Sequence, residues 1–397
     1  MTVNQIPLGE VATFIRGITF KPEDKIDADA PEAVVCMRTK NVQDLLDQDD
    51  LIAIPPSFVN RKEQYLVEGD ILVSTANSWE LVGKSCWVPK IDYKATAGGF
   101  ISILRANREK AFPRYLYHWM NSSETLQKLR YCGRQTTNIS NMSFEQACVL
   151  KLPLPPLPEQ KRIASILDKA DSIRRKRQEA VRLTEELLRS VFLDMFGDPV
   201  TNPKGWETGV LGDVIFSAKD GPHVSPEYST EGIPFLSARH VKPGRIEWND
   251  LKHITAEEAK IHWKKCKPEN GDILYTKGGT TGVAAVFDSD DEIAVWVHIA
   301  LLKLKLDKVN SYWLENMLNT KYCYDQSQRY THGITNQDLG LKRMVNIEMY
   351  IPPLSEQNKF HSAVKKIKNL ASMNMSYFQE AGNAFNSLLQ CAFKGAL

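Results

Sequence analysis

The sequence lacks long apolar runs, a large net charge and paired cysteines, and each absence excludes a class of protein. No stretch approaches the about 18 apolar residues of a membrane-spanning helix, and the start Met1–Gln5 has no basic segment leading into an apolar one, so neither a membrane protein nor a secreted precursor is expected. The formal net charge is only +2, so nucleic-acid binding would depend on local basic surfaces. The seven cysteines are scattered without C-x-x-C spacing, which predicts free thiols in a cytoplasmic protein and no zinc site.

What the chain does contain is an internal repeat. The segment Pro155–Gln160 (PPLPEQ) returns as Pro352–Gln357 (PPLSEQ), and three shorter segments return in the same order. They are Leu8–Val11 with Leu211–Val214, Gly69–Leu72 with Gly271–Leu274, and Thr137–Asn138 with Thr335–Asn336. Each second copy follows 197 to 203 residues after the first, so about half of the chain is duplicated. The repeat predicts two similar domains with pseudo-twofold symmetry, and therefore a target that also has two parts.

Short β-like runs mixed with single helical segments predict that each half is an α+β domain. In the first half these segments are Ala33–Met37, Asp70–Val73, Phe100–Leu104 and a helix over Pro113–Leu129. In the second half they are Ile233–Leu236, Asp272–Tyr275, Ile299–Leu306 and a helix over Tyr312–Asn319. Strands and helices do not alternate strictly, which argues against a parallel βαβ sheet.

Two long, charged segments follow the repeated proline motifs and have a helical pattern. In the C-terminal one, ten positions follow alternating steps of four and three, as in a coiled-coil seam: Phe360, Val364, Ile367, Ala371, Asn374, Phe378, Ala381, Phe385, Leu388 and Ala392. The central helix, Glu159–Phe196, has a less apolar seam in the same steps: Ile166, Ala170, Ile173, Arg177, Ala180, Thr184, Leu187 and Val191. One interpretation is that each helix packs separately on its own domain. The interpretation we prefer is that the two helices pair with each other and run antiparallel. This predicts a first domain over 1–154, a spacer helix over 155–197, a second domain over 198–351 and a C-terminal helix over 352–397.

The repeated proline motifs and the helices after them resemble the specificity subunits of type I restriction–modification systems. Two further segments share the resemblance, the loop Gly279–Val283 leading to Val297–Leu301 and the ending Leu388–Leu397. The resemblance implies two target-recognition domains that each read half of a split DNA site, with two antiparallel helices setting the distance between the halves. It also implies a subunit without catalytic activity that serves methyltransferase subunits, two by symmetry, and with them restriction subunits. The first domain has Thr75–Trp79 where the second has its glycine-rich loop, so the two half-sites should differ.

Enzyme motifs were sought as an alternative. The Pro-Pro pairs are followed by Ser57, Leu157 and Leu354, which lack the aromatic ring that stacks on a flipped base in DNA methyltransferases. Gly83–Ser85 ends like a phosphate-binding loop, but Ser78 replaces its first glycine. His298 stands alone among apolar residues and is expected to be structural, not a metal ligand. We therefore expect no catalytic residue, no metal and no cofactor.

Basic and amide side chains next to glycines and turns are the candidates for contact with double-stranded DNA, because they match phosphates and base edges. In the first domain they are Arg16, Arg38, Lys40, Asn41, Asn77, Arg134, Gln135 and Asn138. In the second they are Lys219, Arg239, His240, Lys277, Thr280, Arg329, His332 and Asn336. Apolar positions on the central helix are predicted to bind methyltransferase subunits, namely Leu167, Val181, Leu188 and Phe192.

Two other classes of function stay open at this point. The duplicated domains on a stiff spacer would also suit a bivalent protein–protein adaptor that binds no nucleic acid. A nuclease or another enzyme with an unrecognised motif is the third possibility.

Overall fold

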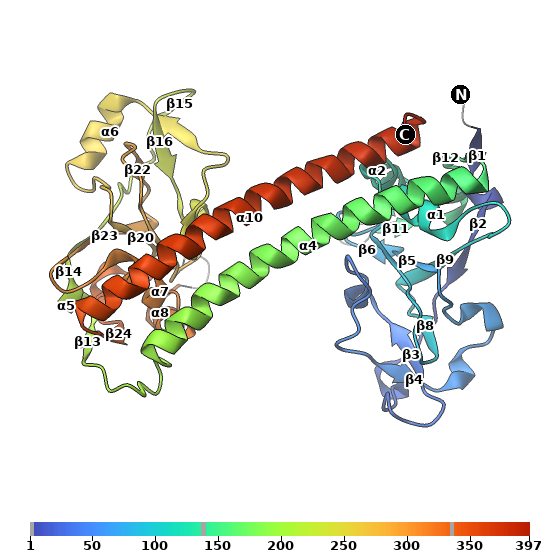
Figure 1. Cartoon of the computed structure of the whole chain (residues 1–397), viewed down its shortest axis with the longest axis horizontal. Coiled ribbons are helices and arrows are strands. Elements are labelled where there is room, and N and C mark those ends of the chain that lie inside the picture. The colour runs from blue at the N-terminus through green and yellow to red at the C-terminus, as the bar shows by residue number, and fades with distance from the viewer. Residues whose placement is uncertain (1–3, 136–139, 334–336) are drawn as a thin grey trace. The chain divides into compact units, whose positions relative to one another are not determined.

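The computed structural model describes residues 4–135, 140–333 and 337–397, except for the side chains of Arg134 and Gln135. It divides into two compact units, Met1–Gln178 with Ser376–Leu397, and Glu179–Met375. Two long helices, α4 (Leu157–Phe196) and α10 (Leu354–Lys394), contribute one half each to both units (Figure 1). Each unit therefore contains one sheet-based domain and two helix halves. The four segments expected from the sequence remain a prediction of how the chain is divided.

The first domain is built on an antiparallel sheet and a smaller mixed one. The antiparallel sheet has the order β2 (Ala12–Arg16), β9 (Ile101–Ala106), β5 (Ile71–Ser74) and β7 (Ser85–Trp87). The mixed sheet has the order β4 (Ala53–Ile54), β3 (Val34–Met37) and β8 (Ala95–Ala97), with β3 and β8 parallel. All residues of β3 and β5 are buried, which explains their unbroken apolar sequences.

The remaining elements of the first domain connect it to the helices and extend its edge. They are β1 (Gln5–Pro7) paired with β12 (Lys151–Pro153), a sheet of β10 (Gly133–Gln135), β11 (Ser140–Met142) and β6 (Ala76–Asn77), and the helices α1 (Pro113–Met120), α2 (Ser123–Tyr131) and α3 (Phe144–Cys148). Helix α1 has Pro113 in its first turn, and α2 begins after Ser122, whose side chain accepts a hydrogen bond from the Thr125 N–H.

The second domain repeats this architecture. Its antiparallel sheet has the order β14 (Ile215–Asp220), β23 (Ile299–Leu304), β20 (Ile273–Thr276) and β21 (Ala284–Val286), and its other sheet has the order β15 (Tyr228–Ser229), β19 (Lys252–Ile254), β16 (Ile233–Leu236) and β22 (Ala294–Val295). The other elements are β13 (Thr208–Val210) paired with β24 (Glu348–Tyr350), the hairpin of β17 (Val241–Lys242) and β18 (Arg245–Ile246), and the helices α5 (Leu211–Val214), α6 (Ala256–Trp263), α7 (Ser311–Leu318), α8 (Lys321–Tyr330) and α9 (Leu341–Met344). The parallel pair β16–β22 matches β3–β8, so the predicted α+β repeat is confirmed.

The two long helices run antiparallel within each unit. In the first unit, Ile163 and Leu167 of α4 share a core with Leu389 and Ala392 near the end of α10. In the second unit the order is reversed, because the end of α4 packs on the beginning of α10, with the Phe192 and Phe360 rings 5.5 Å apart. Each helix ends before a glycine with positive φ, Gly197 or Gly395, a backbone conformation that other residues rarely adopt.

The seam predicted on α10 is confirmed, because all ten of its positions are buried or half-buried. The seam predicted on α4 is half wrong. Ile173, Arg177 and Leu187 are exposed, whereas Leu167 is buried and Leu188 is half-buried. The buried and half-buried positions take the steps of four and three in the opposite order. They are Ile163, Leu167, Ala170, Arg174, Val181, Thr184 and Leu188, with the exposed Arg177 between Arg174 and Val181.

Two absences noted in the sequence have counterparts in the structure. All seven cysteines are free thiols. Within the described residues, no helix combines the length and the apolar character that a membrane crossing requires.

Candidate nucleic-acid interface

In the first domain, three strand ends meet at the turn 98–100, which leads into β9. After β2, the Gly17 N–H donates to the Ile101 carbonyl at 3.2 Å and the Ile18 N–H donates to the Ala97 carbonyl at 2.7 Å. At the end of β3, the Met37 carbonyl accepts from the Gly98 N–H at 2.8 Å. After β5, the N–H groups of Thr75 and Ala76 both donate to the Phe100 carbonyl, at 3.0 and 3.2 Å. Main-chain hydrogen bonds therefore fix this turn from three sides.

The second domain builds the same turn at 296–298. The Trp296 N–H donates to the Leu236 carbonyl at the end of β16, at 2.9 Å. The N–H groups of Lys277 and Gly278, after β20, donate to the His298 carbonyl at 2.9 and 3.3 Å. We call the turn 98–100 the first platform and the turn 296–298 the second platform.

A glycine beside each platform allows the strand to approach it closely. A Cβ atom at Gly17 would overlap the carbonyl oxygen of Gly98, and one at Gly221 would overlap that of Val295. The two glycines follow β2 and β14, which occupy equivalent edges of the two antiparallel sheets. Glycine is therefore required at both positions for steric reasons.

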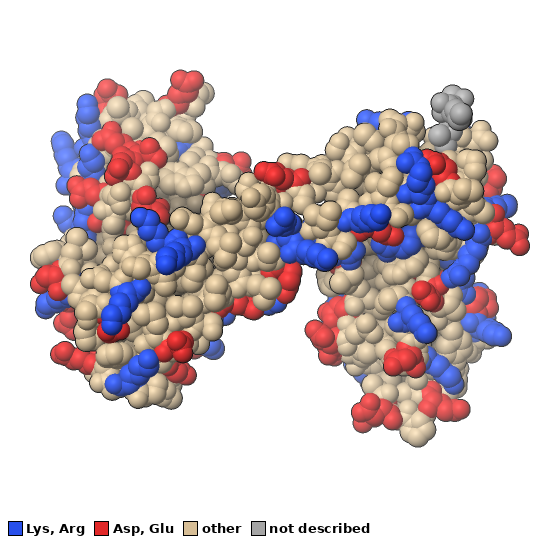
Figure 2. Space-filling model, viewed as in Figure 1, with Lys and Arg blue, Asp and Glu red and all other residues tan. Residues whose placement is uncertain are grey.

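Most of the predicted DNA-contacting residues that the structure describes lie on the segments that meet at the platforms or pair beside them. The exposed ones are Arg16, Lys40, Lys219, Arg239, Thr280, Arg329 and His332, and the half-buried ones are Arg38 and Asn77. Asn138 and Asn336 lie outside the described residues, and for Arg134 and Gln135 only the backbone in β10 is described. In Figure 2 the basic and acidic side chains are scattered among other residues, and the visible face has no large, uniformly basic patch.

Asn41 and His240 differ from the other candidates, because both are buried and hydrogen-bonded within their own loops. The Asn41 side chain accepts from the Arg38 N–H at 2.8 Å and donates to the Asp47 carbonyl at 2.9 Å. The Nδ1 atom of His240 accepts from the Ser237 N–H at 2.9 Å, while burial and the adjacent Arg239 lower the pKa of the His240 imidazole. Both residues shape the loop after a strand through these hydrogen bonds, and their contact with DNA stays a prediction.

Lys277 is also held inside its domain, and its contact with DNA stays a prediction. Its side chain is buried and its ammonium group lies 2.8 Å from Asp338 and 3.4 Å from Asp220. With two carboxylates around it, Lys277 links β14, the glycine-rich loop and the segment around Asp338. Its charge is therefore used inside the domain, and Thr280 at the exposed tip is the better-placed candidate in this loop.

Arg38, after β3, and Arg239, after β16, make equivalent hydrogen bonds. Arg38 donates to the Asp50 carbonyl at 2.8 Å, and Arg239 donates to the Asp250 carbonyl at 2.6 Å. In the first domain the Asp50 carboxylate also pairs with Arg38 and Lys40. Exposed ion pairs of this kind are weak, so a phosphate can compete for these cations.

The sequence did not predict a contact role for the last residue of each platform. Phe100 is 64% exposed at the first platform, and the exposed His298 occupies the same position at the second. The two positions correspond in the repeat, since they are 198 residues apart. A single phenylalanine at a turn, however, does not by itself indicate a contact residue. The described part of the chain contains no cluster of His, Cys, Asp or Glu side chains placed to share a metal ion.

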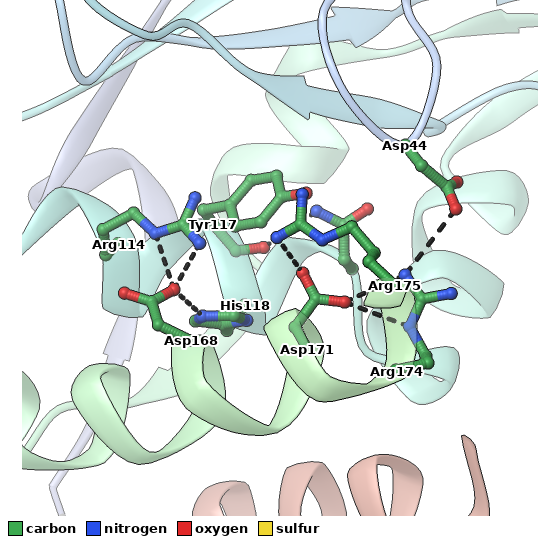
Figure 3. A network of polar contacts seen from close by, with 9 residues as sticks. Asp44, Arg114, Tyr117, His118, Asp168, Asp171, Arg174 and Arg175 are labelled. Carbon is green, nitrogen blue, oxygen red and sulfur yellow. Dashed lines mark hydrogen bonds and ion pairs between the residues drawn. The ribbon is translucent and has the colours of Figure 1, made fainter. Parts of the chain in front are cut away.

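A polar network fixes the first domain on α4 (Figure 3). Asp168 of α4 accepts hydrogen bonds from Arg114 and His118 of α1, the latter at 2.8 Å. One turn later, Asp171 pairs with Arg174 at 2.9 Å and Arg175 at 2.5 Å. Arg174 also lies 3.6 Å from Asp44, in the loop that follows η3 (Thr39–Asn41). The network thus connects α4 both to the core of the domain and to one of the loops with candidate residues.

This network predicts a pH effect on stability. Burial lowers the pKa of His118 below its ordinary value of 6.5, an effect that outweighs the attraction of Asp168, so His118 is neutral in the folded protein. Because the unfolded chain takes up this proton more readily, the stability is complete above pH 6.5 and decreases as the pH falls below it. His118→Gln should flatten this decrease, since glutamine still donates to Asp168 but does not titrate. Urea unfolding at several pH values measures the slope, and equal slopes in variant and wild type would contradict the assignment.

The second domain contacts the helices through one ion pair of each orientation, with the acid on the domain in one and the cation on the domain in the other. Glu315 of α7 is fully buried, accepts from the Val286 N–H at 2.7 Å and lies 3.0 Å from the ammonium group of Lys368 on α10. Burial raises the pKa of the Glu315 carboxyl, and Lys368 is the cation that opposes this effect. Arg245 of β18 pairs with Glu185 of α4 at 3.2 Å. These contacts define the side of each helix that faces the second domain.

The predicted partner-binding residues of α4 are buried or half-buried, and their role in binding stays a prediction. Leu167 and Phe192 are buried in the cores of the first and second units, Leu188 packs against the second core, and Val181 is half-buried. They are seam residues because the antiparallel partner helix and the domains cover this side of α4. Leu167 and Phe192 are therefore covered within the folded units.

A different set of apolar side chains is exposed on the helices of the second unit. Besides Leu193, these are Leu183 and Leu187 on α4 and Leu370 and Met373 on α10. The Asn374 side chain donates to Thr184 at 2.9 Å and marks where the helices touch. At 100° per residue, the four side chains point away from the domain-facing residues Glu185 and Lys368. We call these four residues the helix stripe.

Comparisons with known proteins connect these features. The family description "Type I restriction modification DNA specificity domain" matches residues 2–183 and 203–375. The specificity subunit of the type I restriction enzyme EcoKI from Escherichia coli (strain K12) is 22% identical, covering 98% of this chain and 88% of that protein. The StySPI specificity subunit from Salmonella potsdam is 24% identical with the same coverage. A type I restriction–modification S subunit from M. genitalium has the same fold, with a TM-score of 0.60 and 14% identity over 99% of this chain and 96% of that one.

Proposed function

Since the chain belongs to the family of type I restriction–modification DNA specificity proteins, we propose that each of its two domains reads one half of a bipartite DNA site. The chain is the specificity subunit and carries no catalytic activity of its own. The observation that supports the two-part reading is the pair of platforms, which are built by equivalent main-chain hydrogen bonds in both domains.

The chemistry around the platforms supports contact with DNA. Exposed cations such as Arg16, Lys219 and Arg329 suit phosphates, and Thr280 at a glycine-rich tip can approach the backbone closely. The two domains present different side chains at equivalent positions, for example Phe100 and His298. The two half-sites should therefore differ in sequence.

The helices supply the second part of the proposal. Helix α4 has 40 residues, which correspond to about 60 Å at about 1.5 Å per residue. This exceeds the roughly 34–36 Å of one DNA turn, so we propose that the helices set the number of unread base pairs between the half-sites. We further propose that the helix stripe docks a methyltransferase subunit, and that restriction subunits join through that complex.

A second methyltransferase subunit is proposed from the repeat. Ile173 on α4 occupies in the first unit the position that Leu370 of α10 occupies in the second, counted from the matching Gln160 and Gln357. Ile173 is also exposed. Two equivalent apolar positions suit two copies of the same partner.

The function is tested by methylation sequencing of the host with and without this gene. We expect one bipartite motif to lose its methylation when the gene is absent. The purified chain with its methyltransferase should then bind a duplex with this motif, and the logarithm of the binding constant should fall linearly with the logarithm of the salt concentration. An unchanged methylome together with no binding to duplex DNA would reject the proposal and favour a protein–protein adaptor.

A further inference from the structure

The two platforms each present one ring, and this feature goes beyond the assignment of the domains as DNA readers. We propose that Phe100 and His298 are specificity-determining residues, which rests on the proposed function. Phe100 contacts a thymine methyl group in the first half-site, and His298 donates a hydrogen bond to a purine in the second. These contacts follow from their chemistry, because an apolar ring matches the thymine C5-methyl and an imidazole N–H matches the purine N7.

The two residues are structurally equivalent. The Phe100 carbonyl accepts two N–H groups from the segment after β5, and the His298 carbonyl accepts two from the segment after β20. In both turns the next residue donates a hydrogen bond back to the first residue of the turn. The Ile101 N–H donates to the Gly98 carbonyl and the Ile299 N–H to the Trp296 carbonyl, both at 2.9 Å. The backbone therefore presents the two side chains in the same way, independent of their identity.

The rings are presented outward and not packed into a core. Phe100 remains 64% exposed, although its neighbour Ile101 is fully buried. Single exposed apolar residues are common on proteins, so exposure alone would not identify a contact residue. Here the exposed ring stands on a fixed turn, so little conformational entropy is lost when it meets a base.

His298 provides an independent observation. Its imidazole is stacked on the indole of Trp296, with centroids 6.1 Å apart and planes 3° apart. A Cβ atom at Gly278 would collide with this imidazole, so the glycine-rich loop leaves the space that the ring occupies. The orientation of the ring is thereby set before any ligand binds.

The surroundings of the rings have the chemistry of a DNA contact. The first platform is bonded to segments that carry Arg16, Arg38 and Asn77, and the second to segments that carry Lys219, Arg239 and Thr280. Phosphate contacts fix the register of a protein on DNA but do not read its sequence. A ring on a turn that is bonded to segments with such polar side chains is suited to touch base edges, where the sequence is read.

The test uses the complete methyltransferase complex and duplexes in which single atoms of the bases are removed. Replacing each thymine of the first half-site by deoxyuridine deletes only the methyl group. We expect the replacement at one of these positions to weaken DNA binding by the wild-type complex about tenfold. The Phe100→Ala complex should bind about tenfold more weakly to the natural site but show no further loss at that position, because the contact is already missing.

The second ring is tested in the same way. A 7-deaza purine at one position of the second half-site should weaken DNA binding by the wild-type complex. His298→Ala should make binding insensitive to this modified base. Phe216→Ala is the matched control, since Phe216 is an exposed phenylalanine at the start of β14, far along the strand from the platform. All variants should keep the thermal midpoint and subunit composition of the wild type.

The outcomes separate this inference from the proposed function. If the wild-type complex binds its site and Phe100→Ala and His298→Ala respond to every modified base as the wild type does, the rings are not specificity determinants. A first half-site without thymine on either strand would also overturn the assignment of Phe100. If the wild-type complex itself binds no bipartite site, the proposed function fails.

Discussion

Exchanging residues 1–150 for the corresponding domain of another specificity subunit is expected to replace one half of the recognised site completely and to leave the other half unchanged. The reason is that the first platform takes all of its hydrogen bonds from within the first domain. The donor domain should keep hydrogen-bond donors at the positions of Arg114 and His118, because Asp168 on α4 would otherwise lose its partners. Methylation sequencing of the host measures both half-sites in one experiment.

The control for this exchange is a donor domain that reads the same first half-site as the original. That chimera should methylate the original site, which separates a change in reading from damage to the chain. A change in both half-sites after an exchange confined to residues 1–150 would contradict independent reading by the two domains.

Charged substitutions in the helix stripe are expected to abolish methylation. The double variant Leu187→Glu, Leu370→Glu places two carboxylates where we propose that an apolar helix of the methyltransferase docks, and a loss of at least about 2 kcal/mol is expected from burying them without partners. Since both side chains are exposed in the chain alone, its unfolding transition should change little. Co-purification of the methyltransferase and methylation of the host genome are the two measurements.

Leu193→Glu is the matched control for the stripe. Leu193 is also an exposed leucine of α4, but it lies six residues after Leu187 and therefore points about 120° away from it. This variant should assemble and methylate normally. Normal assembly of the double variant would remove the stripe as the docking surface.

Much of the fold could be predicted from the sequence because its signals are local and repeated. The proline motifs, the duplicated strands and the seam of α10 are visible as patterns of residue type. The seam of α4 was assigned in the wrong step order because its middle is polar, with Arg174, Arg177 and Thr184 at the interface. Arg177 lies over the ring of Tyr377, 4.9 Å from its centroid, so part of this interface is a cation–π contact and not an apolar one.

The candidate site was harder to predict, because exposure depends on contacts between distant segments. Lys40 and Asn41 are neighbours in sequence, yet one is exposed and the other is buried as the hydrogen-bonding centre of its loop. Lys277 resembles a phosphate-binding lysine beside glycines, but two distant carboxylates, Asp220 and Asp338, neutralise it. The platforms themselves consist of main-chain hydrogen bonds, which leave no trace in residue types apart from the glycines.

The main-chain construction of the platforms has a consequence for how new specificities can arise. Since the turn at 98–100 is held by carbonyl and N–H groups that every residue type except proline possesses, the side chain at its tip is free to vary without loss of the scaffold. Neutral drift at such a position changes what is read while the domain stays folded. For the same reason, a combinatorial library at Phe100 and His298 would consist largely of well-folded members, from which selection could recover altered readers.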